Sequence, residues 1–242
     1  LREAIIASVR ELSGRNVATR LYTLTVNKPA ERRRIVPFQG SEGDGFLGSD
    51  GTSVVFTFSG GVGSAPYTVW IGNLETGELR QLTHLTDPRM WDAEPALSPD
   101  GKQVLFIRFR RSAMGIHAQP MLIDLQSGAV SQFLEESDGI LALAYAHDGK
   151  HLALWSKNGL ERAMTDGKER TVILPASEII GMQYYSSGIS WSRSDEKIVF
   201  AIFNKRSAKY ELIELNRSDG RWKAIYSVSG FEIRRPSFVS AS

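Results

Sequence analysis

The chain has 242 residues, of which 42% are hydrophobic and 23% are charged, a composition typical of a globular protein with a sizeable core. Its formal net charge of +2 produces no long-range field that would favour nucleic acid or an anionic membrane surface. The absence of cysteine excludes disulfides, thiolate nucleophiles and cysteine-based zinc sites, and no apolar run approaches the roughly 20 residues that span a bilayer.

Residues 1–40 predict three strands. Apolar residues dominate 4–9, and apolar and polar residues alternate in 18–26. Residues 32–38 are predicted as a third strand that runs back along the second. The segments 13–16 and 27–30 between them carry the glycine, asparagine and proline typical of turns. The chain therefore begins with three strands of a sheet.

A tight hairpin turn with the sequence SPDG, at residues 98–101, recurs along the chain in varied forms. Proline at its second position fixes φ, aspartate at the third can hydrogen-bond its own backbone, and glycine at the fourth supplies a positive φ. Each turn precedes an apolar strand. Equivalent residues of these strands follow one another in steps of 50, 48 and 46 residues: Val54, Val104, Leu152 and Ile198.

A second hairpin repeats in phase with the first, so each repeat contains four strands. The repeats occupy 41–87, 88–137, 138–180 and 181–228, while 231–240 matches the run 91–98, so 229–242 supplies the strand that 1–40 lacks. We therefore expect an all-β fold, a single β-propeller domain over 1–242 with five four-stranded blades, closed by the C-terminal strand joining the N-terminal blade. The open alternative is a piece of a six- or seven-bladed protein.

The motif Asp92-x-x-Pro95-x-x-Ser98-Pro99-Asp100-Gly101-Lys102, together with TGELRQLT at 76–83, resembles the TolB-type β-propeller repeat. This repeat also occurs in the propeller domains of prolyl oligopeptidase and dipeptidyl peptidase relatives. The turn departs from SPDG in the last two repeats, which read AHDG at 146–149 and SRSD at 192–195. The resemblance implies a protein or peptide partner, associated with the cell envelope, and a periplasmic or extracellular location.

Catalytic and metal-binding motifs are missing from the sequence. No G-x-S-x-G motif provides a serine nucleophile, and Ser98 is a turn residue. His147 and His151 are separated by a turn, which prevents them from forming one face as they would on a helix. The glycine-rich segment 60–63 lacks the lysine and helix of a phosphate loop. We expect neither a metal nor another cofactor.

Propellers generally bind ligands at the mouth of the central channel, where the innermost strands begin. Carboxylates around such a mouth, with two tyrosines, could hold a cation, a basic peptide or a sugar. In the alternative interpretation, Asp92 and Glu94 cap backbone groups or pair with Arg234. The candidate binding residues are Asp44, Asp92, Glu94, Asp138, Tyr184, Tyr185, Glu232 and Arg234.

Short basic clusters occur at 32–34, 108–111 and 234–235. Adjacent residues of a strand point to opposite faces, so these clusters do not form one cationic surface. Single-stranded nucleic acid would also require interleaved exposed aromatic residues. The sequence therefore predicts no nucleic-acid partner.

These observations favour a monomeric, non-enzymatic binding or scaffolding module without membrane insertion. It would recognise a protein or peptide partner through its channel mouth and through loops at 60–66 and 110–118, which interrupt otherwise regular hairpins. The alternative is a hydrolase or lyase, glycan-active or peptidase-associated, that uses acidic residues at the central funnel.

Overall fold

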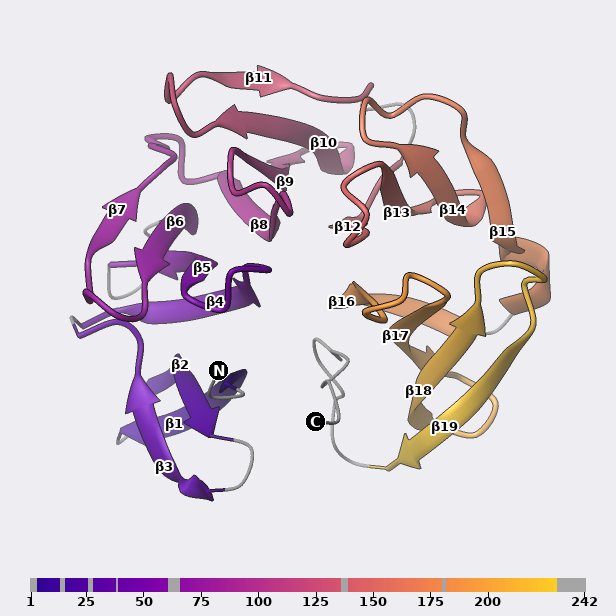
Figure 1. Cartoon of the computed structure of the whole chain (residues 1–242), viewed down its shortest axis with the longest axis horizontal. Helices are drawn as coiled ribbons and strands as arrows, with labels where there is room; N and C mark the ends of the chain where they lie inside the picture. The colour runs from indigo at the N-terminus through magenta and orange to yellow at the C-terminus, as the bar shows by residue number, and fades with distance from the viewer. Residues whose placement is uncertain are drawn as a thin grey trace. The chain divides into compact units, whose positions relative to one another are not determined.

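The structure, a computed structural model, describes residues 4–13, 16–25, 28–37, 39–60, 66–135, 139–179 and 182–229. The chain divides into two compact units, Leu1–Phe133 and Leu134–Ser242. Each unit consists of antiparallel sheets in which strands that are consecutive in sequence pair with each other. Figure 1 shows these sheets in chain order, from indigo at the N-terminus to yellow at the C-terminus.

The first unit contains one three-stranded and two four-stranded sheets. The three-stranded sheet consists of β1 (Ala4–Ser13), β2 (Asn16–Thr25) and β3 (Lys28–Arg34). The next consists of β4 (Ser41–Leu47), β5 (Ser53–Ser59), β6 (Thr68–Asn73) and β7 (Leu79–Gln81). The third consists of β8 (Met90–Leu97), β9 (Gln103–Ser112), β10 (Gly115–Asp124) and β11 (Val130–Gln132).

The second unit contains two four-stranded sheets. The first consists of β12 (Ala142–Tyr145), β13 (His151–Ser156), β14 (Gly159–Met164) and β15 (Thr171–Pro175), followed by a short 3-10 helix (Ala176–Ile179). The second consists of β16 (Met182–Trp191), β17 (Lys197–Asn204), β18 (Lys209–Asn216) and β19 (Trp222–Val228). In the described part of the chain, no helix is long and apolar enough to cross a membrane.

The recurring turn predicted from the sequence is present in all four four-stranded sheets. In the SPDG turn, the Gly101 amide donates to the Ser98 carbonyl at 2.9 Å, and Gly101 has φ of 71°. The same bond from the fourth to the first residue closes the turns at 48–51, 146–149 and 192–195. The fourth turn places Asp195 rather than glycine at the positive φ, 55°.

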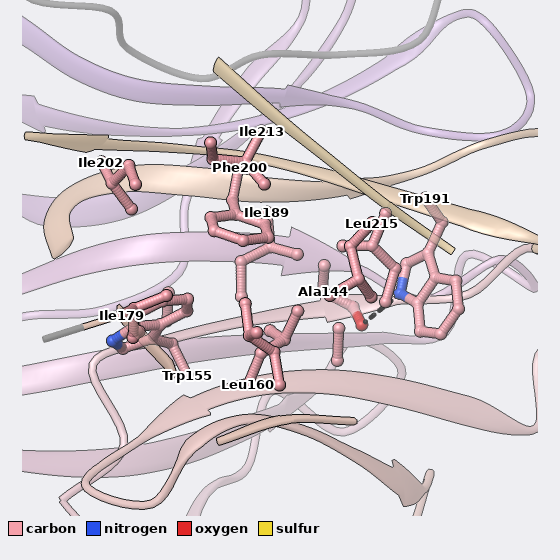
Figure 2. Packing of buried hydrophobic residues seen from close by; sticks show 14 of the residues in the cluster. Ala144, Trp155, Leu160, Ile179, Ile189, Trp191, Phe200, Ile202, Ile213 and Leu215 are labelled. Carbon is pink, nitrogen blue, oxygen red and sulfur yellow. Dashed lines mark hydrogen bonds between the residues drawn. The ribbon is translucent and has the colours of Figure 1, made fainter. Parts of the chain in front are cut away.

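Apolar residues of the central strands form the core within each unit. In the first unit, one cluster joins β5 to β8 and β9 and includes Val55 and Phe106, both fully buried. In the second unit, Trp155, Trp191 and Phe200 pack with aliphatic residues of the same sheets, as Figure 2 shows. The Trp191 indole N–H donates to the carbonyl of Ala144 on β12 at 3.2 Å, which joins the two sheets.

The structure corrects three details of the sequence prediction. Residues 27–30, predicted as a turn, include the start of β3 at Lys28. Residues 92–95, which the sequence analysis placed in the repeat motif without assigning them to a strand, lie within β8, because a β-bulge between Ala93 and Ala96 lets the ladder continue past Pro95. Residues 110–118, predicted as a loop, continue β9 and β10 as a regular hairpin with a turn of two residues. The predicted loop at 60–66 lies partly, and the predicted closing segment 231–242 entirely, outside the described residues.

Candidate functional site

Acidic residues occupy equivalent places in β4 and β8, the first strands of two successive sheets. The sequences SEGDGFL and WDAEPAL align with the 50-residue step of the repeat, so Glu42 corresponds to Asp92 and Asp44 to Glu94. Both strands carry a β-bulge at this point, between Glu42 and Gly45 and between Ala93 and Ala96. Bulges change the direction of side chains and are frequent beside binding sites.

Asp92 is completely buried and forms a two-pronged ion pair with Arg108 of β9. The guanidinium Nε donates to Oδ1 at 2.8 Å and Nη2 donates to Oδ2 at 3.0 Å. The Asp92 amide also donates to the Tyr67 carbonyl of the preceding sheet at 2.9 Å. Because both carboxylate oxygens accept from one guanidinium, Asp92 fixes the bulged strand against its neighbour.

Glu42 plays the corresponding part in β4. Its carboxylate is also completely buried and accepts from Nη2 of Arg34 at 2.8 Å. It also accepts from the backbone amide of Leu21 on β2, and Arg20 lies 3.8 Å away. The sequence prediction missed Glu42 and its arginines, although the 50-residue step to Asp92 was a signal that could have identified Glu42.

Asp44 and Glu94 lie together in the first unit. The amide of Glu94 donates to Oδ2 of Asp44 at 3.2 Å, which links the bulges of β8 and β4. Glu94 is 2% exposed and has a positive φ of 54°. A residue with a side chain rarely adopts this backbone conformation, and such strain is concentrated at functional sites.

The other predicted binding residues are described less fully. Tyr184 and Tyr185 lie in β16, whose ladder shifts between Tyr184 and Ile189, and only their place in the strand is described. Both belong to the second unit, whereas Asp44, Asp92 and Glu94 belong to the first. Asp138, Glu232 and Arg234 lie outside the described residues.

The histidines and the serine of the turns contact turn residues or the strand that follows the turn. The His147 ring Nδ1 lies 3.1 Å from Oδ1 of Asp195, and that of His151 lies 2.6 Å from Oδ2 of Asp148. The Ser98 hydroxyl oxygen accepts the Gln103 amide at 2.9 Å. Across the described ranges, no three histidine, aspartate or glutamate side chains gather as metal ligands.

Another buried acid, Glu161 of β14, holds the sheet of β12 to β15 together. Glu161 is 2% exposed and lies 2.6 Å from Nε of Arg170. Burial raises the pKa of this carboxyl, but hydrogen bonds from Arg170, Ser156 and Asn158 outweigh burial and hold the pKa below its ordinary value. Glu161 therefore remains ionised and structural at neutral pH.

The arrangement of sheets matches solved structures. No family model and no curated protein sequence matches the chain. It aligns with TolB from Acinetobacter baumannii at 18% identity and a TM-score of 0.67, over 95% of this chain and 54% of that protein. It aligns with a structure named as a TolB of Agrobacterium tumefaciens at 15% identity and a TM-score of 0.71, over 97% and 85% of the two chains.

This chain has a TolB-like β-propeller fold. It spans about half the length of the Acinetobacter protein. The same fold also matches oligogalacturonate lyase from Vibrio parahaemolyticus, at 10% identity and a TM-score of 0.60, over 96% of this chain and 64% of the lyase. These likenesses establish the TolB-like propeller fold, and a fold of this kind carries many activities.

Proposed function

We propose that this TolB-like propeller is a non-enzymatic binding module that recognises a protein or peptide partner through its loops and the mouth of its channel. The observation that carries the proposal is the engagement of Asp92, whose carboxylate is fully buried and bonded at both oxygens to Arg108. A carboxylate held in this way stabilises the strand and is not available as a general acid or base.

The bulged strands then serve as a rigid frame for recognition. Ion pairs fix Glu42 and Asp92, and the Glu94 amide bonds Asp44, so this edge of the two sheets is preorganised. A rigid surface loses little conformational entropy when a partner binds, which favours affinity. Asp44, which is partly exposed, would offer its carboxylate to a basic or polar segment of the partner, and the buried Glu94 would hold the bulge beside it.

Three further points belong to this proposal. Residues 1–242 would form one five-bladed domain, in which 229–242 adds a fourth strand to the sheet of β1 to β3. The chain would act as a monomer. By analogy with the TolB structures it resembles, it would work in the cell envelope, in the periplasm or outside the cell.

An enzyme is the second candidate. The fold matches an oligogalacturonate lyase, and the closeness of Asp44 to Glu94 brings two acidic residues together. In this case the chain would cleave an acidic glycan, and the two carboxylates would take part in proton transfer or hold a cation.

The test removes both charges without changing side-chain shape, in the double variant Asp44→Asn, Glu94→Gln. A partner is captured from envelope extract of the source cells and purified, and its dissociation constant is measured. The binding function predicts at least a tenfold weaker complex for the double variant. Asp166→Asn, an exposed turn acid whose side chain is 56% exposed, is the matched control and should bind like the wild type.

The same proteins are incubated with oligogalacturonate, and unsaturated products are measured by ultraviolet absorbance. The binding function predicts no turnover by any of them. Turnover by the wild type that disappears in the double variant, while the circular dichroism spectrum is unchanged, would replace the binding function with the lyase.

A further inference from the structure

A small cavity lies between the first two sheets of the first unit, where the end of β3 meets the turn that joins β6 to β7. Its volume is about 60 Å³. Its lining combines apolar side chains with nitrogen donors, and includes Ile35, Val54, Leu74 and Leu79 of the first kind and Arg33 and Asn73 of the second. An apolar recess with a few polar groups is the usual composition of a binding site.

Arg33 lies at the rim of this cavity. The residue is exposed, and its Nη1 lies 3.4 Å from the carbonyl oxygen of Leu74. A Cβ added at Gly77 would lie 3.9 Å from Nη2, so the guanidinium extends over the turn at 73–78. A guanidinium has five N–H donors, so Arg33 can donate to a carboxylate alongside the contacts that it already makes.

Asn73 supplies a second donor, whose orientation is fixed by its own turn. Its Oδ1 accepts the amides of Glu75 and Thr76 at 2.8 and 3.0 Å. These bonds hold the oxygen end of the side-chain amide in the turn, which leaves Nδ2 as the donor end beside the cavity. Arg34 also lines the cavity, but its Nη2 lies 2.8 Å from the buried carboxylate of Glu42, to which its charge is committed.

We propose that this cavity binds the C-terminal residue of a partner protein, when that residue is valine or has a side chain of similar size. A volume of 60 Å³ has room for roughly two water-sized groups, which matches the two methyl groups of valine. The α-carboxylate would accept from the Arg33 guanidinium and from Nδ2 of Asn73. Only the last residue of a polypeptide joins a backbone carboxylate and a side chain at one carbon atom, so both parts of the site are used together.

The surroundings of the cavity favour a chain end over a free small acid. Residues 75–78 of the turn are all exposed, so the cavity opens at the surface and a chain can lead out of it. Two of these residues, Glu75 and Glu78, are acidic, and they would attract a basic residue of the partner. We therefore expect lysine or arginine immediately before the C-terminal residue.

The inference rests on the proposed binding function, of which it names one contact, separate from the bulged strands β4 and β8. The probe is a fluorescent synthetic peptide that ends in lysine and valine with a free carboxylate, titrated against the intact protein by anisotropy. Its two controls are the same peptide with a C-terminal amide and a peptide that ends in lysine and tryptophan. We expect each control to bind at least tenfold more weakly, because one lacks the carboxylate and the other has a side chain too large for the cavity.

Two variants locate the site on the protein. Arg33→Gln removes the charge at the rim and should weaken peptide binding at least tenfold. Asn73→Asp keeps the oxygen that accepts the turn amides and replaces the donor with a second oxygen, so it should also weaken binding at least tenfold. Lys102→Gln removes an exposed charge that does not line the cavity, and this matched control should bind like the wild type.

Equal binding of the amidated peptide, or equal binding of the free peptide to wild type and Arg33→Gln, would overturn the inference. So would displacement of the peptide by an equal concentration of 3-methylbutanoate, which is valine without its amino group, since the cavity would then take a free acid. The amidated peptide keeps the test decisive if a variant does not fold. If the peptide does not bind and the captured partner binds Arg33→Gln like the wild type, the inference fails while the binding function stands.

Discussion

The turn at 98–101 and the turn at 192–195 close equivalent hairpins, but they use their aspartates differently. At 98–101, Asp100 is the third residue and accepts the Lys102 amide at 3.1 Å, and Asp50 and Asp148 accept the corresponding amides in the turns at 48–51 and 146–149. In the last, the aspartate is one position later, at the positive φ that glycine occupies in the other three. A one-residue shift changes what the carboxylate contacts.

Asp195 reaches the neighbouring sheet. Its carboxylate accepts the amides of His147 and Asp148, both at 2.8 Å, from the turn between β12 and β13. Asp195 is 7% exposed, so these bonds are largely shielded from water. The comparison suggests that the last turn tolerates a strained backbone because its carboxylate joins two sheets of the second unit.

The largest effect is expected from Asp195→Ala. The substitution keeps a side chain at the strained φ and leaves the His147 and Asp148 amides without their acceptor, so we expect a loss of about 2 kcal/mol in the free energy of unfolding. Urea unfolding followed by tryptophan fluorescence measures this loss in the second unit. Asp195→Asn, which keeps one oxygen acceptor, should lose less than half as much. A loss below about 0.5 kcal/mol for Asp195→Ala would show that the carboxylate does not join the sheets.

Asp195→Gly separates the two contributions. Glycine adopts the positive φ without steric cost, so this variant loses the carboxylate but also relieves the strain. We expect it to be roughly 1 kcal/mol more stable than Asp195→Ala and still less stable than the wild type. The same urea titrations give the comparison. If Asp195→Gly equals or exceeds the wild type in stability, strain outweighs the bonds of the carboxylate.

The contrast between the turns also shows what the sequence could predict. The spacing of the turns and the glycine at their fourth position were sufficient to place the hairpins, because turn chemistry is local. The role of Asp195 was not predictable, because it depends on contacts with His147 and Asp148, which lie 48 and 47 positions earlier. Next to the turn, Leu97 of β8 pairs with Val104 of β9. If this register continued along the two strands without a bulge, Phe109 would lie opposite Asp92. The bulge shifts the ladder by one residue, so Arg108 lies there instead.

The site was therefore predicted in part. The acidic residues of β8 were identified from the repeat, but the one ion-pair partner named for them, in the alternative interpretation, was Arg234, which lies outside the described residues. The buried partner of Asp92 is Arg108, which the sequence analysis had assigned to a basic cluster. Local sequence patterns do not reveal a bulge formed by Glu94 and Pro95, because it depends on the neighbouring strand.

The converse substitution, Gly101→Asp, introduces an aspartate at the fourth position of the turn at 98–101. An added Cβ at Gly101 meets nothing within 4 Å, so the change costs only backbone strain at φ of 71°. We expect a loss of roughly 0.5 to 1 kcal/mol, since aspartate tolerates this conformation better than most residues. Thermal unfolding measures it, with Gly101→Asn as the uncharged control. An unchanged or higher midpoint would mean that the turn selects glycine for a reason other than φ.

The smallest effect concerns pH and the third position of the turn. The Ser98 hydroxyl, and after it the Lys102 amide, donate to Asp100 and hold the pKa of its carboxyl below the ordinary value of 3.8. Because the folded pKa is the lower one, the ionised carboxylate stabilises the fold at pH values above 3.8, and this contribution is lost as the pH falls through the folded pKa.

Asp100→Asn should remove this dependence while keeping an oxygen that accepts the Lys102 amide. The measurement is the unfolding midpoint of both proteins between about pH 5 and about pH 3, where the wild type should lose slightly more stability than the variant. Asp100 is exposed, so the difference is small compared with the effect at Asp195. Parallel pH profiles for the two proteins would mean that the Asp100 carboxylate serves only to shape its turn. Of the two turn carboxylates compared, only that of Asp195 would then contribute to stability through its charge and its contacts with another sheet.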